Sequence, residues 1–210
     1  LKNASGSAYI EFGGNKILAG VFGPRDVHPK HMSNPDTGIL RVRYHMEPFS
    51  VGERKKPAPS RREIEISKVI TEALRPAVML EKFPRTALDV YLEVLQADGG
   101  TRCAALDAAS VAIADAGIPM RDLVCACAAG KAADAIILDV NNEEDQAGQA
   151  DMPIGYMPSL GKITLLQLDG VLTTDEYKKC IELGLEGCKQ VYEIQKNALR
   201  EKYFSDGDNN

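Results

Sequence analysis

Alternating apolar and polar residues predict the strands of this chain, because successive side chains of a strand point to opposite faces of a sheet. The alternation is clearest where Leu88, Val90, Leu92 and Val94 are separated by polar or aromatic residues. The same reasoning predicts strands at residues 7–12, 16–22, 38–49, 88–94, 123–129, 135–140, 152–157 and 162–168.

Glycine-containing turns and polar loops separate these strands. Gly13-Gly14-Asn15, Gly130-Lys131 and Leu160-Gly161 each stand between two strands that are neighbours in the sequence, so each is predicted to turn a hairpin. Residues 23–37, 50–59 and 141–151 are predicted to be longer loops. The second of these loops is basic and the third is acidic.

Apolar residues at a spacing of three to four predict three helices. The first begins at Ser60, which forms a capping box with Glu63, and Pro76 kinks or restarts it. The second is rich in alanine, follows the strand at 88–94, and stops at Gly117. The third runs from residue 173 to about 204.

These elements predict an α/β (α+β) fold in which mixed sheets pack against helices. The sequence shows no repeat, low-complexity tract or linker, so we expect one domain over residues 1–204 and a disordered tail at 205–210. No apolar run reaches the roughly 18–20 residues that a membrane span needs, and no signal peptide opens the chain. We therefore expect no membrane association.

Composition adds two expectations. The net charge is −5, but residues 1–62 carry 11 Lys and Arg against 5 Asp and Glu, so the remaining residues are strongly acidic. This asymmetry favours one face for a polyanion and another for a metal or basic partner, although it is also compatible with ordinary solvated faces. Five cysteines without a C-x-x-C pair indicate buried core residues and a reducing cytoplasm.

The first candidate site is the turn between the strand at 88–94 and the alanine-rich helix. Gly99 and Gly100 allow backbone N–H groups to converge at the helix N-terminus, where the helix dipole favours an anion. Thr101 adds a hydroxyl donor, and Arg102 adds a planar guanidinium that suits phosphate. The alternative is a tight turn that happens to precede an exposed arginine.

The second candidate is the pair Arg61 and Arg62, in the first turn of the helix that begins at Ser60. Cations there oppose the helix dipole by roughly 0.3–1 kcal/mol each. Two arginines at this position are explained if a bound anion shares the helix N-terminus with them. The alternative is a surface pair, tolerated because exposed dipole effects are small.

The third candidate is the acidic stretch, where Asp145 and Asp151 flank the approach to the next apolar strand. Carboxylates this closely spaced repel one another unless a divalent cation or a basic partner neutralises them. One of the two could instead act as a general acid or base. The alternative is a solvated loop without a ligand.

No serine-hydrolase or Walker-type motif is present. A phosphate site, carboxylates able to hold Mg²⁺ and a basic N-terminal region together favour phosphoryl chemistry on a nucleic acid.

Four motifs in the same order resemble the ribonuclease PH family of phosphorolytic 3′→5′ exoribonucleases, and within it the branch that forms the catalytic ring of the archaeal exosome. They are Pro-Ser-Arg-Arg-Glu-Ile at 59–64, Gln-Ala-Asp-Gly-Gly-Thr-Arg at 96–102, Ala-Asp-Ala-Gly-Ile-Pro-Met-Arg-Asp at 114–122 and Glu-Asp-x5-Asp-Met-Pro at 144–153. The resemblance covers essentially the whole chain. The family usually has a further N-terminal segment with an Asp-Gly-Arg motif that this sequence lacks.

The resemblance implies a ribonuclease PH-like domain that shortens single-stranded RNA, not DNA, with inorganic phosphate as co-substrate. It implies that Asp145 and Asp151 carry catalysis and hold Mg²⁺ or Mn²⁺. The implied phosphate-binding residues are Gly99, Gly100, Thr101, Arg102 and Arg62, and the implied RNA-binding residues are Arg61, Arg62 and Lys30.

The same resemblance implies the partners. They are an inactive paralogous subunit, with which the chain would form a ring of three heterodimers, and RNA-binding cap subunits. Two other interpretations remain open at this point. One is a noncatalytic subunit that binds RNA and scaffolds the same ring, and the other is a bacterial-type ribonuclease PH that trims the 3′ ends of transfer RNA.

Overall fold

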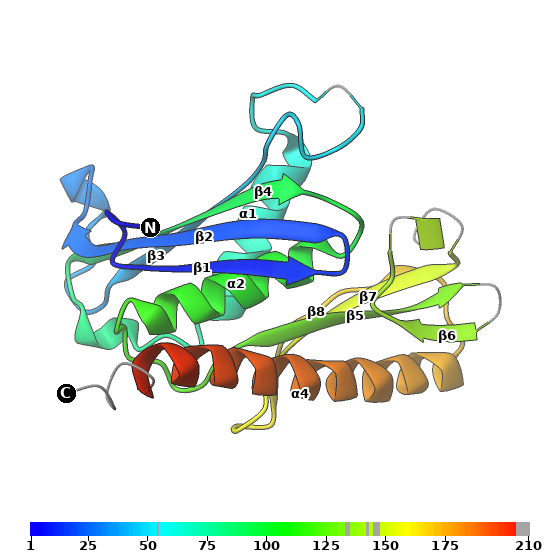
Figure 1. The fold of residues 1–210 in the computed structure, drawn as a ribbon. Coiled ribbons are helices and arrows are strands. Elements are labelled where there is room, and N and C mark those ends of the chain that lie inside the picture. The colour runs from blue at the N-terminus through cyan, green and yellow to red at the C-terminus, as the bar shows by residue number, and fades with distance from the viewer. Residues whose placement is uncertain (54, 133–134, 142, 145–147, 205–210) are drawn as a thin grey trace.

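The computed structural model describes residues 1–53, 55–132, 135–141, 143–144 and 148–204. Two β-sheets lie side by side, and helices pack against both (Figure 1). The α+β class expected from the sequence is confirmed. The acidic Asp145 and the tail at 205–210 lie outside the described residues.

The first sheet has four strands in the order β1-β2-β4-β3. Neighbouring strands are antiparallel except β3 and β4, which are parallel. The strands are β1 (Gly6–Phe12), β2 (Asn15–Asp26), β3 (Ile39–Met46) and β4 (Thr86–Gln96).

The second sheet has five strands, all antiparallel, in the order β6-β5-β7-β8 with β9 beside β7. The strands are β5 (Cys125–Ala132), β6 (Ala135–Leu138), β7 (Ala150–Met157), β8 (Lys162–Leu166) and β9 (Asp169–Gly170).

Long helices pack against both sheets, as Figure 1 shows. Helix α2 contacts β1 and β2 of the first sheet and β5 of the second, so it lies at the junction of the two sheets. Helix α4 runs along the second sheet, while α1 packs on β3. The helical segments are α1 (Arg61–Leu74), α2 (Thr101–Asp115) and α4 (Thr174–Phe204), with 3₁₀ turns η1 (Lys30–Met32) and η2 (Leu80–Lys82).

The helix boundaries follow the capping signals in the sequence. Ser60 accepts a hydrogen bond from the backbone N–H of Glu63, and the Glu63 carboxylate accepts from the backbone N–H of Ser60, so the capping box is confirmed. Helix α1 ends at Leu74 without restarting, because Pro76 cannot continue the backbone hydrogen bonds of the helix. Helix α2 ends before Gly117, which has φ +69°.

Several predictions about strands and turns were wrong. Gly130-Lys131 does not form a turn, because β5 continues through both residues to Ala132. Gly130 is needed there for a close approach, since an added Cβ would lie 2.5 Å from the backbone oxygen of Ala150. In addition, β2 extends to Asp26, four residues into the predicted loop, with an irregular register around Pro24.

The core is continuous through α2, whose small side chains allow both sheets to approach it. Its residues from Cys103 to Ala112 include five buried alanines at less than about 1% exposure. All five cysteines are free and buried, as the sequence predicts. Because α2 is held on both sides, its N-terminus has a fixed position between the sheets.

Candidate active site

A cleft of about 400 Å³ lies at the N-terminus of α2 and is lined by residues of α1, α2 and the second sheet. It brings together parts of all three candidate sites found in the sequence. Its lining residues are Arg62, Glu65, Gly100, Thr101, Arg102, Cys103, Ala128, Asp151, Pro153, Gln167, Leu168 and Asp169.

The double-glycine turn that opens α2 adopts a backbone conformation that side chains disfavour. Gly99 has φ +74° and Gly100 has φ +58°, both in the left-handed region. Asn15 holds the turn from the start of β2: its amide donates to the Gly99 carbonyl at 2.6 Å and its side-chain oxygen accepts from the backbone N–H of Asp98 at 2.8 Å. Gly99 itself shapes the turn and does not line the cleft.

The first turn of α2 is available to bind an anion. Gly100 is the N-cap residue and has no side chain with which to cap the helix. The N–H of Cys103 donates to the carbonyl of Gly100 at 3.0 Å. The N–H groups of the first residues of a helix have no partner within it, and the dipole makes this end positive. Thr101 lies there with its Oγ1 accepting a 2.9 Å hydrogen bond from the hydroxyl of Tyr44. The helix end that the sequence predicts to bind an anion lies in the cleft lining.

Arg102 is held in the cleft by two polar side chains. Its Nη1 donates to Oε1 of Gln167 at 2.5 Å, and its Nη2 donates to Oε2 of Glu65 at 3.1 Å. Gln167 in turn donates to Oε1 of Glu65 at 3.4 Å, so the three side chains form a closed ring of contacts. The Nε of Arg102 is buried and has no hydrogen-bond partner among the described residues.

The two arginines at the start of α1 lie differently. Arg62 lines the cleft, whereas Arg61 does not. Both side chains are exposed. Arg62 therefore places a second guanidinium beside Arg102, with which it can share a phosphate group.

The predicted Asp151 lies in the cleft, but in a strand and not in the acidic loop. It is the second residue of β7 and stands directly opposite Asp169 of β9 in the antiparallel register. Directly opposite residues have Cβ atoms about 4.5–5.5 Å apart. Asp151 and Asp169 are therefore close enough in the sheet to offer carboxylates to one Mg²⁺, which proteins hold with one or two carboxylates together with substrate phosphates. Where Asp145 lies is not described.

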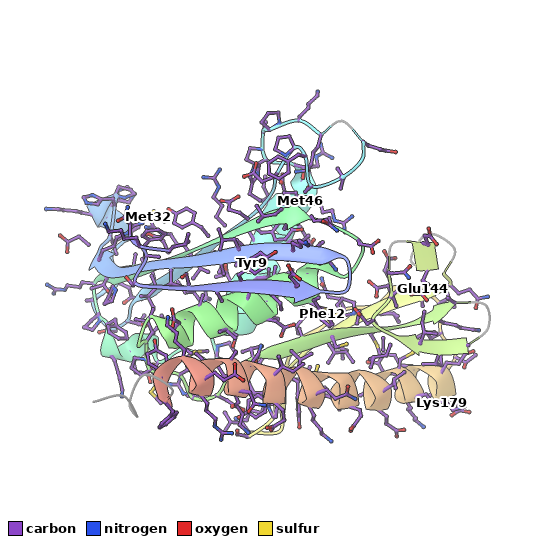
Figure 2. The ribbon with its side chains drawn as sticks, viewed as in Figure 1. Tyr9, Phe12, Met32, Met46, Glu144 and Lys179 are labelled. Atoms are coloured by element: carbon purple, nitrogen blue, oxygen red, sulfur yellow. The ribbon has the colours of Figure 1, made fainter. Side chains whose placement is uncertain are left out.

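Lys30 does not line the cleft. It belongs to the turn η1, and Figure 2 shows Met32 of that turn and Glu144 at opposite ends of the molecule. Lys30 is exposed. Any contact it makes with RNA would lie outside the cleft lining.

Four residues of the site were not identified from the sequence: Tyr44, Glu65, Gln167 and Asp169. Tyr44 belongs to β3, where the pattern of the sequence predicts a strand but no functional residue. Glu65 could have been found, because it is one helical turn after Arg62 and therefore on the same face of α1. The sequence holds no comparable signal for Gln167 and Asp169, which reach the cleft only because β7, β8 and β9 pair.

A further group of possible ligands lies outside the cleft lining. His45, Glu47 and Glu93 each offer a ligand atom, and these atoms lie within 4.8 Å of one another. Burial, together with nearby Glu47, raises the pKa of Glu93. His45 also lies 3.2 Å from the buried carboxylate of Glu63.

Among the described residues, no helix is both long and apolar enough to cross a membrane.

Two family models match the chain. The model described as 3′ exoribonuclease family, domain 1, matches residues 1–119, and the one described as domain 2 of the same family matches residues 122–187. The boundary falls between α2 and β5, where the chain passes from one sheet to the other.

Curated relatives match nearly the whole chain. The exosome complex component Rrp41 of Nitrosopumilus maritimus is 84% identical over 204 residues, which are 97% of this chain and 84% of the relative. Rrp41 of Cenarchaeum symbiosum is 76% identical over 99% of this chain and 86% of its own length. Rrp41 of Pyrococcus abyssi is 64% identical over 97% of this chain and 82% of its own length.

Solved structures have the same fold. Rice Rrp46 superposes with a TM-score of 0.82 at 26% identity, covering 95% of this chain and 90% of that one. A chain of the Archaeoglobus fulgidus exosome, determined with RNA bound to the active site, superposes with a TM-score of 0.80 at 21% identity. The superposition covers 92% of this chain and 84% of that one.

Proposed function

The chain belongs to the 3′ exoribonuclease family of ribonuclease PH-like proteins, and we propose that it is a catalytic exosome subunit that shortens RNA from the 3′ end with inorganic phosphate. The single observation that carries this proposal is the cleft in which Arg62, Arg102 and Asp151 meet at the N-terminus of α2. A noncatalytic scaffold would not need all of these groups in one place.

In the proposed reaction, an oxygen of inorganic phosphate bonds to the phosphorus of the last phosphodiester. The bond from that phosphorus to the 3′ oxygen of the preceding nucleotide breaks, that oxygen takes a proton, and a nucleoside diphosphate leaves. The reverse reaction adds nucleotides from diphosphates. Arg102, Thr101 and the first turn of α2 would bind the attacking phosphate, while Arg62 would hold either that phosphate or the RNA 3′ end.

The residues present also fit a divalent cation, Mg²⁺ or Mn²⁺. Asp151 and Asp169 would hold it, with Asp145 as the further ligand that the sequence suggests. When bound, the cation stabilises negative charge on the scissile phosphate and the leaving oxygen. Asp145 or Asp151 could also move the proton that the leaving oxygen requires.

The proposal extends to assembly. The curated relatives are named exosome components, so we place this chain in an exosome ring with an inactive paralogous subunit, as a trimer of heterodimers with RNA-binding caps. An acidic subunit can act on RNA in such a ring, because the assembled channel supplies the basic surface. Five free buried thiols suit a reducing compartment, and we place the subunit in the cytoplasm.

The test is a release assay with poly(A) as substrate. Wild-type protein, with and without the paralogue, is incubated with and without inorganic phosphate, and the products are separated. We expect ADP, and only when phosphate is present. Release of AMP without phosphate would identify a hydrolytic enzyme, and absence of release in every mixture that still binds RNA would identify a scaffold subunit.

A further inference from the structure

Glu65 places a carboxylate beside Arg102, one of the groups assigned to the phosphate. Its side chain is 44% exposed and lines the cleft together with Arg62 and Arg102. A carboxylate repels a bound anion, and like charges at short range weaken binding. Its position in the middle of a phosphate site therefore requires a chemical explanation.

The contacts of Glu65 hold the carboxylate in place without using all of its acceptor capacity. Oε2 accepts from Nη2 of Arg102 at 3.1 Å, and Oε1 accepts from Nε2 of Gln167 at 3.4 Å. An ionised carboxylate has about four lone-pair sites and no donor. The remaining sites can accept a hydrogen bond, but only from a ligand that carries a proton.

We propose that Glu65 makes the cleft selective for hydrogen phosphate over sulfate, by accepting a hydrogen bond from a hydroxyl of the bound phosphate. This inference rests on the proposed function, since it concerns the phosphate that the reaction consumes. Glu65 is in this view a specificity-determining residue, whose carboxylate is kept beside the anion by Arg102 and Gln167.

Phosphate and sulfate differ in the protons that they carry at neutral pH. Inorganic phosphate keeps at least one hydroxyl throughout the neutral pH range, so one of its oxygens can donate to Glu65 while the others accept from Arg102 and α2. Sulfate has a similar size and charge but carries no hydroxyl. The sulfate oxygens and the Glu65 carboxylate are all hydrogen-bond acceptors, so no hydrogen bond can form between them. A site that requires a hydrogen bond rejects a ligand unable to make it.

The decisive variant is Glu65→Gln. Glutamine keeps the shape of the side chain, but its amide can donate an N–H to a sulfate oxygen. The matched control is Glu72→Gln, which removes the same charge from an exposed position on the same helix, outside the cleft lining. Dissociation constants for phosphate and for sulfate are measured separately by calorimetry at one ionic strength, on the full chain.

We expect wild type and Glu72→Gln to bind phosphate at least about tenfold more tightly than sulfate, the scale of one hydrogen bond to a charged group. In Glu65→Gln this ratio should fall about tenfold, chiefly because sulfate binds more tightly. An unchanged ratio overturns the inference. An equal loss of affinity for phosphate and for sulfate also overturns the inference, because Glu65 would then only position Arg102.

Failure of this inference can be told apart from failure of the proposed function. If wild type releases ADP only with phosphate, and Glu65→Gln keeps the wild-type anion ratio, the function stands and the role of Glu65 falls. If wild type neither binds phosphate nor uses it, both fall. As a kinetic check, sulfate should inhibit ADP release by Glu65→Gln at about tenfold lower concentration than it inhibits wild type.

Discussion

The hydroxyl of Tyr44 donates a 2.9 Å hydrogen bond to Oγ1 of Thr101, and both residues are buried. Tyr44 belongs to β3, at the edge of the first sheet, and Thr101 is the first residue of α2. Because Oγ1 accepts from Tyr44, the hydroxyl proton of Thr101 remains available to donate to an anion in the cleft. The core of the first sheet thus orients a donor of the proposed phosphate site.

Tyr44→Phe should weaken phosphate binding while preserving the fold. Without the tyrosine hydroxyl, Thr101 can rotate and lose its role as a fixed donor, so we expect the phosphate KM to rise several-fold. Stability should fall by about 1 kcal/mol, the net value of one hydrogen bond. Phosphate-dependent ADP release and urea unfolding measure the two effects. Tyr9→Phe, at an exposed tyrosine of β1, should change neither KM nor kcat.

Arg102→Lys should raise the phosphate KM by at least about tenfold, because lysine cannot reproduce the planar fork of a guanidinium. A lysine cannot contact Gln167 and Glu65 through two separate terminal nitrogens, as Arg102 does. Arg121→Lys is the matched control: Arg121 likewise contacts a carbonyl and a carboxylate, those of Val78 and Glu81, but outside the cleft. Similar KM values for both variants would contradict the assigned role.

Asp151→Asn should reduce phosphorolysis by at least about 100-fold, because a bound cation and proton transfer both need the carboxylate. RNA affinity should stay within several-fold of wild type, since the arginines are untouched. Asp145→Asn should behave in the same way. ADP release, RNA binding by fluorescence anisotropy and Mn²⁺ binding by electron paramagnetic resonance provide the readouts. The control is Asp36→Asn, in an exposed loop. Equal ADP release by Asp36→Asn and Asp151→Asn would refute the role assigned to Asp151.

Glu63 should make stability depend on acid pH. Burial alone would raise its pKa, but hydrogen bonds from Lys55 and from the backbone of Met46 and Ser60 outweigh burial and lower the pKa to about 2. A lowered carboxyl pKa contributes stability above the unfolded-state pKa, and this stability is lost as pH falls toward the folded value.

The contribution of Glu63 is on the order of 3 kcal/mol at neutral pH. Thermal unfolding between pH 5 and 2 checks it: wild type should lose stability across this range more steeply than Glu63→Gln. Glu72→Gln, on the same helix but exposed, should follow the wild-type curve. Parallel curves for wild type and Glu63→Gln would exclude the linkage.

Asp107 should make the stability of the protein depend on pH in the direction opposite to Glu63. It is fully buried in α2, and burial raises its pKa well above the usual range. Its Oδ1 accepts from the backbone N–H of Ala126 and from Nε2 of Gln195. A raised carboxyl pKa means that folding takes up a proton once pH exceeds the unfolded-state pKa, so stability decreases as pH rises from there.

Asp107→Asn keeps the accepting oxygen and needs no proton, so at pH 8 it should be more stable than wild type. Asp107→Ala should be less stable by about 2 kcal/mol, because it leaves buried donors without an acceptor. Urea unfolding at pH 5 and pH 8 measures both. A variant Asp107→Asn that is less stable than wild type at pH 8 would show that Asp107 is ionised in the folded protein.

Local signals in the sequence were sufficient where the cause of a structure is local. The capping box of Ser60 and Glu63 gave the start of α1, because both partners lie within one helical turn. Gly99 and Gly100 gave the turn into α2, because their backbone conformation suits glycine. Gly130 was misassigned because the reason for that glycine is Ala150, which comes from another strand and is close only in the folded sheet.

The sequence by itself determined the fold class, and it singled out the helix start, the arginines and the aspartate that line the candidate site. These depend on periodicity, capping and residue chemistry, all of which act over a few neighbouring positions. Only the tertiary structure decided which of these groups share a cleft. It placed Asp151 opposite Asp169 and closed Glu65, Arg102 and Gln167 into one ring of contacts. Such contacts join residues up to about a hundred positions apart, and strand pairing and helix packing, not local sequence, bring them together.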